Sequence, residues 1–239
     1  MAPLTSPSAS MPVALPAHLI VTIDGPAGVG KSSVARLAAE RMGLAFLDTG
    51  AMYRAVTALA LARQIDPLDE PAVAALATEA HIRFDWDAKP PVLVAYGREM
   101  KEELRTADVD AAVSAVSSLP AVRRVLVGLQ QRIGEEHPRL LSEGRDQGTV
   151  VFPDACAKIY LDASPRVRAE RRAKQLRDAG RAADPASIER ELMERDRLDS
   201  TREVGPLRCP PDAIRLDTSG LSREQVIDEI VRIVHGAIG

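Results

Sequence analysis

Residues 25–32 read Gly-Pro-Ala-Gly-Val-Gly-Lys-Ser, a complete Gly-x-x-x-x-Gly-Lys-Ser sequence, and no other segment limits the possible folds as strongly. The apolar run 19–23 precedes it as a buried strand would, and residues 33–41 follow it with apolar side chains at helical spacing. Glycines let the backbone N–H groups approach an anion closely, together with the positive end of the following helix. The segment therefore predicts a phosphate-binding loop between a strand and a helix. An unliganded turn has no need for a lysine followed by a hydroxyl.

Each residue type in the loop has an expected chemical role. Lys31 is expected at the β and γ phosphates of a triphosphate, and the Ser32 hydroxyl is expected to be a ligand of Mg²⁺. The residues predicted to bind the triphosphate are Gly25, Pro26, Ala27, Gly28, Val29, Gly30, Lys31, Ser32 and Ser33. Together they predict one half of a phosphate-transfer or phosphate-sensing site.

Short apolar runs alternate with helical patterns along most of the remaining chain. After the first strand, further buried strands are expected at 44–47, 139–142, 158–161 and 213–216. Strands separated by helices are typical of a parallel sheet, so we predict an α/β fold with five parallel strands flanked by helices. Gly43 is expected to end the first helix, and Ser222 with Gln225 forms a capping-box pattern at the start of the last one.

Two segments depart from this alternation. Residues 66–105 read as an alanine-rich helix followed by two strand-like runs, 81–86 and 92–96, which predicts a small antiparallel insertion in a core formed by 18–65 and 106–239. An insertion of this kind is a candidate for gripping a second substrate or for a surface hairpin without function. Residues 1–17 are rich in proline, serine and alanine, and we interpret them as a disordered tail.

Composition excludes several classes of function. The 239 residues carry a net charge of −3, which argues against a surface that coats nucleic acid. The two cysteines form no Cys-x-x-Cys pair and the four histidines are scattered, so no metal centre or disulfide framework is expected. The tail has no basic residue of the kind that begins a secretory signal, and no apolar run approaches the roughly 20 residues of a membrane span. We expect a cytoplasmic protein with small-molecule substrates and no nucleic-acid or membrane partner.

Arginines follow the predicted strands at the edge of the sheet where α/β proteins bind ligands. Residues 48–54 and 143–149 each place glycine, a carboxylate and an arginine, Arg54 or Arg145, just past a strand. Two guanidinium groups at equivalent positions favour an anion site beside the triphosphate loop. A third cluster, 194–202, has Arg195, Asp199 and Arg202 on one face if a helix continues through them. A solvated, salt-bridged helix surface is the alternative for that cluster.

Four segments together resemble the cytidylate kinase family, the (d)CMP kinases among the nucleoside monophosphate kinases. They are 23–33 (Ile-Asp-Gly-Pro-Ala-Gly-Val-Gly-Lys-Ser-Ser), 48–54 (Asp-Thr-Gly-Ala-Met-Tyr-Arg), 144–154 (Gly-Arg-Asp-Gln-Gly-Thr-Val-Val-Phe-Pro-Asp) and 195–202 (Arg-Asp-Arg-Leu-Asp-Ser-Thr-Arg). The resemblance implies a P-loop kinase core, a monophosphate-binding insertion at 66–105 and a short lid at about 175–187. The chain departs from the family pattern at Gln147, where an apolar residue is expected, and at Glu203 and Gly205, where residues such as alanine are expected.

The resemblance also implies site residues. Thr49, Tyr53, Arg54 and Arg145 are expected near the acceptor nucleotide and its phosphate, and Ser114, Arg123 and Asp146 around the cytosine. Asp199 and Arg202, with Arg195, are expected at the sugar and phosphate. Lys31, Arg168, Arg172 and Arg195 are expected to stabilise the transferred phosphoryl group.

The implied reaction is transfer of the γ-phosphoryl group of ATP, with Mg²⁺, to CMP or dCMP by a monomeric enzyme. A related P-loop kinase with UMP, AMP or shikimate as the acceptor is an alternative, and so is a protein that senses or hydrolyses ATP without an acceptor. The absence of an Asn-Lys-x-Asp sequence and the arginine-rich segments argue against the latter. A binding protein without activity is a third alternative, which the acidic charge balance disfavours if its partner is nucleic acid.

Overall fold

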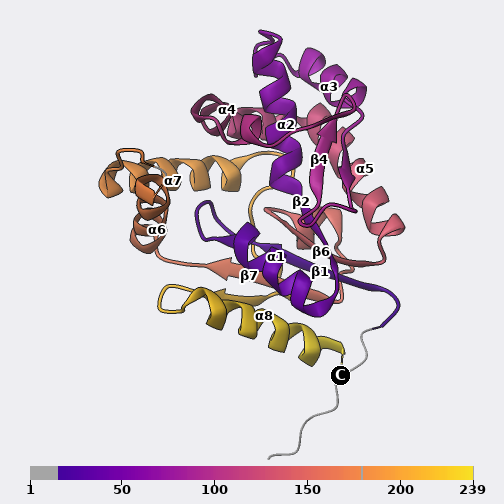
Figure 1. Cartoon of the computed structure of the whole chain (residues 1–239), viewed down its shortest axis with the longest axis vertical. Coiled ribbons are helices and arrows are strands. Elements are labelled where there is room, and N and C mark those ends of the chain that lie inside the picture. Colours follow the sequence, from indigo (N-terminus) through magenta and orange to yellow (C-terminus); the bar gives the residue numbers. More distant parts are fainter. Residues whose placement is uncertain (1–15, 179, 239) are drawn as a thin grey trace, which may run out of the picture.

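The core is a five-stranded parallel sheet in the order β2-β6-β1-β7-β8 (Figure 1). The computed structural model describes residues 16–178 and 180–238. The strands are β1 (Leu19–Asp24), β2 (Ala45–Asp48), β6 (Arg139–Gly144), β7 (Ala157–Asp162) and β8 (Ile214–Asp217). All five lie within about two residues of their predicted positions, so the predicted five-stranded parallel sheet is confirmed.

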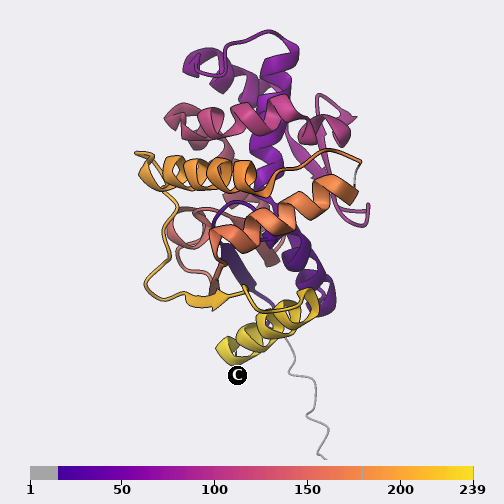
Figure 2. The same cartoon turned by 90° about the vertical axis from the view of Figure 1, so that its left-hand side faces the viewer.

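Helices cover both faces of this sheet, because successive strand residues point to opposite sides. On one face, Leu19, Val21 and Leu141 pack against α1 (Lys31–Met42) and α8 (Arg223–Ile238). On the other, Ile20, Leu47 and Leu140 pack against α2 (Thr49–Ala62), α4 (Ala107–Ser118) and α5 (Pro120–Glu136). Helices α6 (Pro165–Asp178) and α7 (Pro185–Thr201) pack together at one side and face the viewer in Figure 2.

The predicted end of α1 and the predicted start of α8 are confirmed. Gly30, with a φ of 96°, precedes α1, and Gly43 ends that helix in the left-handed conformation. The Ser222 amide donates to Gln225 Oε1 at 2.9 Å and the Gln225 amide donates to Ser222 Oγ at 3.2 Å, which is the predicted capping box of α8.

The insertion has one strand more than predicted. Helix α3 (Glu70–Glu79) is followed by β3 (Arg83–Asp85), β4 (Val92–Ala95) and β5 (Arg98–Glu99), which form a separate antiparallel sheet. The prediction missed β5 because two exposed charged residues give no apolar signal. A 3₁₀ turn, η1 (Glu102–Arg105), leads into α4. The insertion shares its apolar core with α2 and α5, so its boundaries remain a prediction from the sequence.

Three further predictions meet the structure only in part. Residues 1–15 of the predicted tail lie outside the described residues, and Pro16 and Ala17 are exposed. The predicted lid spans the end of α6, the connection 180–184 and the start of α7. Within the described ranges, no single helix has the length and apolar composition of a membrane span, although α4 and α5 pass that test together with a 92° bend between them.

Candidate active site

The phosphate-binding loop lies at the carboxyl end of β1, with Lys31 folded over it. Lys31 Nζ donates to the carbonyl oxygens of Gly25 and Pro26 at 2.8 and 2.9 Å. A Cβ on Gly25 would overlap the Leu161 carbonyl, so glycine is required there. Burial lowers the pKa of Lys31 to about 7, and the nearby charge of Arg145 acts in the same direction. The loop is thus a desolvated cation site, poised to gain from a bound anion.

Ser32 faces two carboxylates across the sheet edge. Its hydroxyl donates to Glu143 Oε1 at 2.6 Å, and Asp48 accepts from the Ala51 amide as the N-cap of α2. Burial raises the pKa of Glu143 to about 8, with the charge of Asp48 next in size. Two carboxylates that repel each other beside a hydroxyl form an oxygen donor set of the type that Mg²⁺ prefers. In the part of the chain that the structure describes, no group of three or more His, Cys, Asp or Glu side chains is placed to hold a metal ion.

An ion pair between Arg168 of α6 and Asp196 of α7 also contacts the phosphate-binding loop. Arg168 is buried and donates to Asp196 Oδ2 at 2.6 Å, to the Ala27 carbonyl at 2.8 Å and to the Ala163 carbonyl at 3.1 Å. The other oxygen of Asp196 accepts from the Ala27 amide at 2.9 Å. The peptide groups of Ala27 are therefore held on both sides. This arrangement gives Arg168 a role in positioning the loop, besides its predicted role at the phosphoryl group.

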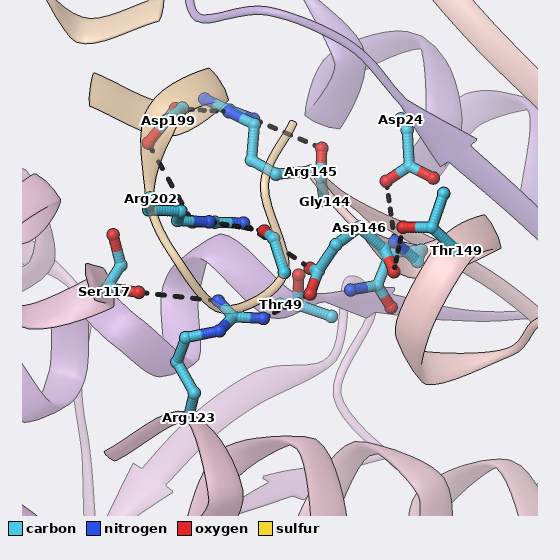
Figure 3. Close-up of polar contacts among 12 residues, drawn as sticks. Asp24, Thr49, Ser117, Arg123, Gly144, Arg145, Asp146, Thr149, Asp199 and Arg202 are labelled. Carbon is cyan, nitrogen blue, oxygen red and sulfur yellow. Dashed lines mark hydrogen bonds and ion pairs between the residues drawn. The ribbon is translucent and has the colours of Figure 1, made fainter. Parts of the chain in front are cut away.

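The buried ion pair between Arg123 and Asp146 lies at the centre of a second polar site (Figure 3). Arg123 from α5 donates to Asp146 through Nη2, and its Nη1 donates to the Ser117 carbonyl on α4 at 3.4 Å. Both charged side chains are less than a twentieth exposed. Arg202 lies 3.8 Å from Asp146 and donates to the Gly205 carbonyl. A Cβ on Gly205, whose φ is 59°, would overlap both Arg123 and Asp146, so the chain turns closely over this pair.

The structure brings most of the predicted acceptor residues to this second site. Tyr53 lies with its ring 5.7 Å from the Arg123 guanidinium carbon, and burial raises the pKa of its hydroxyl to about 12. The Thr49 hydroxyl donates to the Glu143 carbonyl at 2.7 Å. Ser114 is half-buried on α4, one turn before Ser117, whose hydroxyl donates to the Ser114 carbonyl at 3.1 Å. The Ser117 carbonyl, rather than Ser114, is the α4 group that contacts Arg123.

Arginines from two parts of the chain, the loop after β6 and helix α7 with its C-cap, gather around Asp199. Arg145 Nε donates to Asp199 Oδ2 at 2.9 Å. Burial raises the pKa of Asp199, but Arg145, Arg195 and Arg202 outweigh it and hold that pKa below its usual range. Burial lowers the pKa of Arg195 to about 10, with the charge of Arg145 adding to the effect. Arg202 is the C-cap residue beyond the end of α7, so the predicted shared helical face holds for Arg195 and Asp199 but not for Arg202.

The two remaining predicted arginines, Arg54 and Arg172, meet on one carboxylate. Arg54 from α2 and Arg172 from α6 both contact Asp110 on α4, at 2.7 and 3.0 Å. Nothing in the local sequence singled out Asp110, because it reads as an ordinary acidic residue in the first turn of a helix.

Two buried residues that the sequence analysis did not assign hold the segment after β6. Asp24 accepts from the amides of Gln147 and Gly148, each at 2.8 Å, at the single π-helical turn η2 (Gln147–Val151). The Gln147 side chain accepts from Ser142 at 2.8 Å and donates to Gln130 at 3.2 Å. Where the family pattern has an apolar residue, this chain therefore has Gln147, whose side chain is buried and hydrogen-bonded. The only signal for Asp24 was a carboxylate in an otherwise apolar strand.

Several buried polar atoms at the acceptor side have no hydrogen-bond partner among the described residues. They are Tyr53 Oη, Arg123 Nε, Arg195 Nε and Arg202 Nη2. Such atoms cost free energy unless a ligand pairs with them. The second site is therefore a polar cluster, rich in arginine, whose unpaired donors suit an anionic ligand with hydrogen-bonding groups.

Comparisons with known proteins show which family the chain belongs to. The chain is 46% identical over 216 residues to a cytidylate kinase of Nocardia farcinica (strain IFM 10152), covering 90% of this chain and 93% of that protein. It is 47% identical over 218 residues to one of Mycobacterium avium (strain 104), covering 91% and 96%. A crystal structure of an uncharacterized protein from Eubacterium ventriosum ATCC 27560 shares the fold, with a TM-score of 0.50 and 10% identity over 92% of this chain and 99% of that one. The sequence model of the family described as cytidylate kinase matches residues 21–236, and the chain belongs to that family.

Proposed function

We propose that the protein transfers the γ-phosphoryl group of ATP to the phosphate of CMP and dCMP. The observation that carries this proposal is the group of unpaired buried donors around Arg123 and Asp146, beside a loop built for a triphosphate. Membership of the cytidylate kinase family supports the choice of acceptor. UMP, AMP and shikimate lack the cytosine edge that a paired arginine and carboxylate suit. An ATP switch would leave the unpaired buried donors of the second site without a ligand.

The donor side binds and orients the triphosphate. Backbone N–H groups of the loop from Gly28 to Ser33 surround its phosphates, and Lys31 exchanges its two carbonyl contacts for phosphate oxygens. A phosphate beside Lys31 raises its lowered pKa, so the lysine is cationic when ATP is bound. Arg168 and Asp196 hold the loop at Ala27 while this occurs.

The acceptor side supplies alignment rather than proton transfer. The phosphate of CMP is already an anion near neutral pH, so no general base is needed to create the nucleophile. Arg54 and Arg145 bind that phosphate, Arg123 and Asp146 bind the base, and Asp199 with Arg202 binds the sugar. Arg172 and Arg195 stabilise the charge that spreads over the transferred group. Catalysis then arises from in-line positioning of two anions by arginines from several elements.

The residues at the loop also fit Mg²⁺. Ser32, which lies 2.6 Å from Glu143, would hold the ion together with Glu143 and Asp48 through oxygen contacts and water. The ion supplies charge neutralisation at the phosphates when it is bound. The same proposal includes a monomer acting in the cytoplasm, which gel filtration and cell fractionation would test.

The decisive experiment measures ADP production from ATP and Mg²⁺ with CMP, dCMP, UMP, dTMP, AMP or shikimate, each supplied separately. We expect CMP and dCMP to give the highest kcat/KM. Equal rates with UMP or AMP would rule out the cytidylate assignment. ADP formation at the same rate with every acceptor and with none would indicate an ATP hydrolase or switch instead.

A further inference from the structure

Asp110 joins two cations that come from different parts of the chain. Its Oδ1 lies 2.7 Å from Arg54 Nη1 and its Oδ2 lies 3.0 Å from Arg172 Nη2. Arg54 also donates to the Leu104 carbonyl at 3.0 Å, which fixes it from the other side. Both carboxylate oxygens of Asp110 are therefore in use, one for each arginine. An amide in its place has one acceptor oxygen and a donor group that faces a guanidinium.

The position of Asp110 in the fold matches a role in the site. It stands on α4, which packs against α2 and also contacts α7 (Figures 1 and 2), while Arg54 stands on α2, the helix that directly follows β2. The charges of Arg145, Asp199, Arg54 and Asp110 all act on the pKa of Arg195, so Asp110 and its partner Arg54 lie within electrostatic range of that arginine. One carboxylate thus lies among several arginines at the site proposed for the phosphates.

The ion pairs of Asp110 are expected to contribute little to folding stability. The side chains of Asp110, Arg54 and Arg172 are 27%, 23% and 37% exposed. Ion pairs as exposed as these contribute little to stability. Two neighbouring guanidinium groups without an anion between them repel each other, however, and each long side chain then samples other rotamers. The main effect of Asp110 is on where the two guanidinium groups lie.

We propose that Asp110 is a positioning residue that holds Arg54 and Arg172 together as one phosphate-binding unit. The inference rests on the proposed function, because it takes the acceptor's phosphate as the anion that Arg54 meets and the adjoining transferred phosphoryl group as the one that Arg172 meets. Prepositioned arginines lose less conformational entropy when they bind a phosphate than free ones do. Asp110 thereby links the acceptor side, through Arg54, to helix α6, through Arg172.

The test compares Asp110→Asn with Asp108→Asn. Asp108 is in the same helical turn and exposed, and it forms no ion pair within residues 16–178 and 180–238, so it controls for the loss of one helix-terminal charge. Calorimetric titration of CMP should show roughly tenfold weaker binding to Asp110→Asn, the size expected for one lost charge-assisted hydrogen bond. The KM for CMP should rise similarly, while the KM for ATP and the melting temperature stay within error of the wild type. Asp108→Asn should bind CMP as the wild type does.

A double-mutant cycle tests whether Asp110 acts through Arg172. In an Arg172→Gln background, the Asp110→Asn change should weaken CMP binding by less than about threefold, because one of its two partners is gone. An undiminished tenfold effect, an equal loss with Asp108→Asn, or unchanged CMP binding in Asp110→Asn would each overturn the proposal. If the wild type neither binds nor phosphorylates CMP, the proposed function itself fails. Inorganic phosphate then serves as the probe: weaker binding to Asp110→Asn supports the positioning role, and equal binding refutes it.

Discussion

Buried charge distinguishes Arg123 and Asp146 from the exposed ion pairs of this chain. Exposed ion pairs such as Lys174 with Asp178 are solvated, and each contributes little to stability. Arg123 and Asp146, by contrast, are almost fully buried, and each is the main counter-charge of the other. Removing one partner leaves an uncompensated charge in a low dielectric. Selectivity for the base and a cost in stability are therefore expected from the same pair.

A substitution at Asp146 should change the choice of base. Asp146→Asn keeps the shape of the side chain but removes its charge, so the pocket loses its strongest acceptor. We expect kcat/KM for CMP to fall by about 10²-fold, while the value for UMP changes much less. Steady-state rates with both nucleotides provide the measurement, with the exposed Asp154→Asn as the control. Equal losses for CMP and UMP would show that Asp146 does not read the base.

Lys31 should matter to turnover more than to folding. Lys31→Met retains a long apolar stem in a buried position and removes the charge at the transferred phosphate. We expect kcat to fall by about 10³-fold with the melting temperature preserved or raised, because a desolvated cation has been removed. The matched control is Lys174→Met on the exposed face of α6. A variant that keeps more than a tenth of wild-type kcat would contradict the assigned role.

At the scale of the elements, the ends of the strands place the chemistry. β1 ends at Asp24, which binds two amides of η2, and η2 follows Arg145 and Asp146 directly. A carboxylate from one strand thus fixes the loop after its neighbour. The buried side-chain bonds from Gln147 to Ser142 and to Gln130 hold the same loop from the opposite side.

The link between β1 and η2 should depend on pH. Burial raises the pKa of Asp24 from 3.8 to about 6, against the two amide hydrogen bonds that lower it. Between these values the folded state binds more protons than the unfolded state, so stability falls as pH rises. A shift from 3.8 to about 6 corresponds to a loss on the order of 3 kcal/mol between pH 4 and pH 7. Urea unfolding of the wild type and Asp24→Asn should show their difference in unfolding free energy changing by this amount. A difference that is constant with pH would contradict it, and Asp87→Asn, an exposed site, is the control.

Local sequence patterns predicted the helices and strands well, but they could not predict contacts between residues that are far apart in the sequence. The glycine loop, the five strands and the Ser222 capping box each depend on residues close together in the sequence, so they could be found. The partner of Asp24 lies 123 residues away, and Asp110 meets Arg172 at a separation of 62. Such pairs exist only after the sheet and α6 have formed. Only the resemblance to a family placed Arg123 beside Asp146 in advance.

At the scale of the whole molecule, the insertion and the core share one apolar cluster. Val73, Phe84 and Leu93 of the insertion belong to the same cluster as Leu47 and Leu140 of the central sheet. Trp86 packs against His137 at the end of α5, with ring centroids 4.1 Å apart. The insertion is therefore expected to lose its packing when the core does.

Equilibrium unfolding should accordingly be a single transition. Trp86 is the only tryptophan, so fluorescence reports the insertion, while circular dichroism reports all helices. We expect both signals to share one midpoint in urea. Ile230→Ala, which removes a fully buried side chain of α8 on the far face of the sheet, should lower both midpoints together through a loss of about 2–4 kcal/mol. A fluorescence midpoint that stays unchanged in this variant would mean that the insertion unfolds separately.

The close turn at Gly205 has a consequence for how this protein tolerates genetic change. A residue with no side chain does no chemistry, yet any Cβ there would force apart Arg123 and Asp146, which lie 82 and 59 positions earlier in the chain. In a library that replaces every residue in turn, position 205 should be nearly as intolerant as Lys31. In evolution, Gly205 is expected to change only after substitutions elsewhere have moved Arg123 and Asp146 away from it.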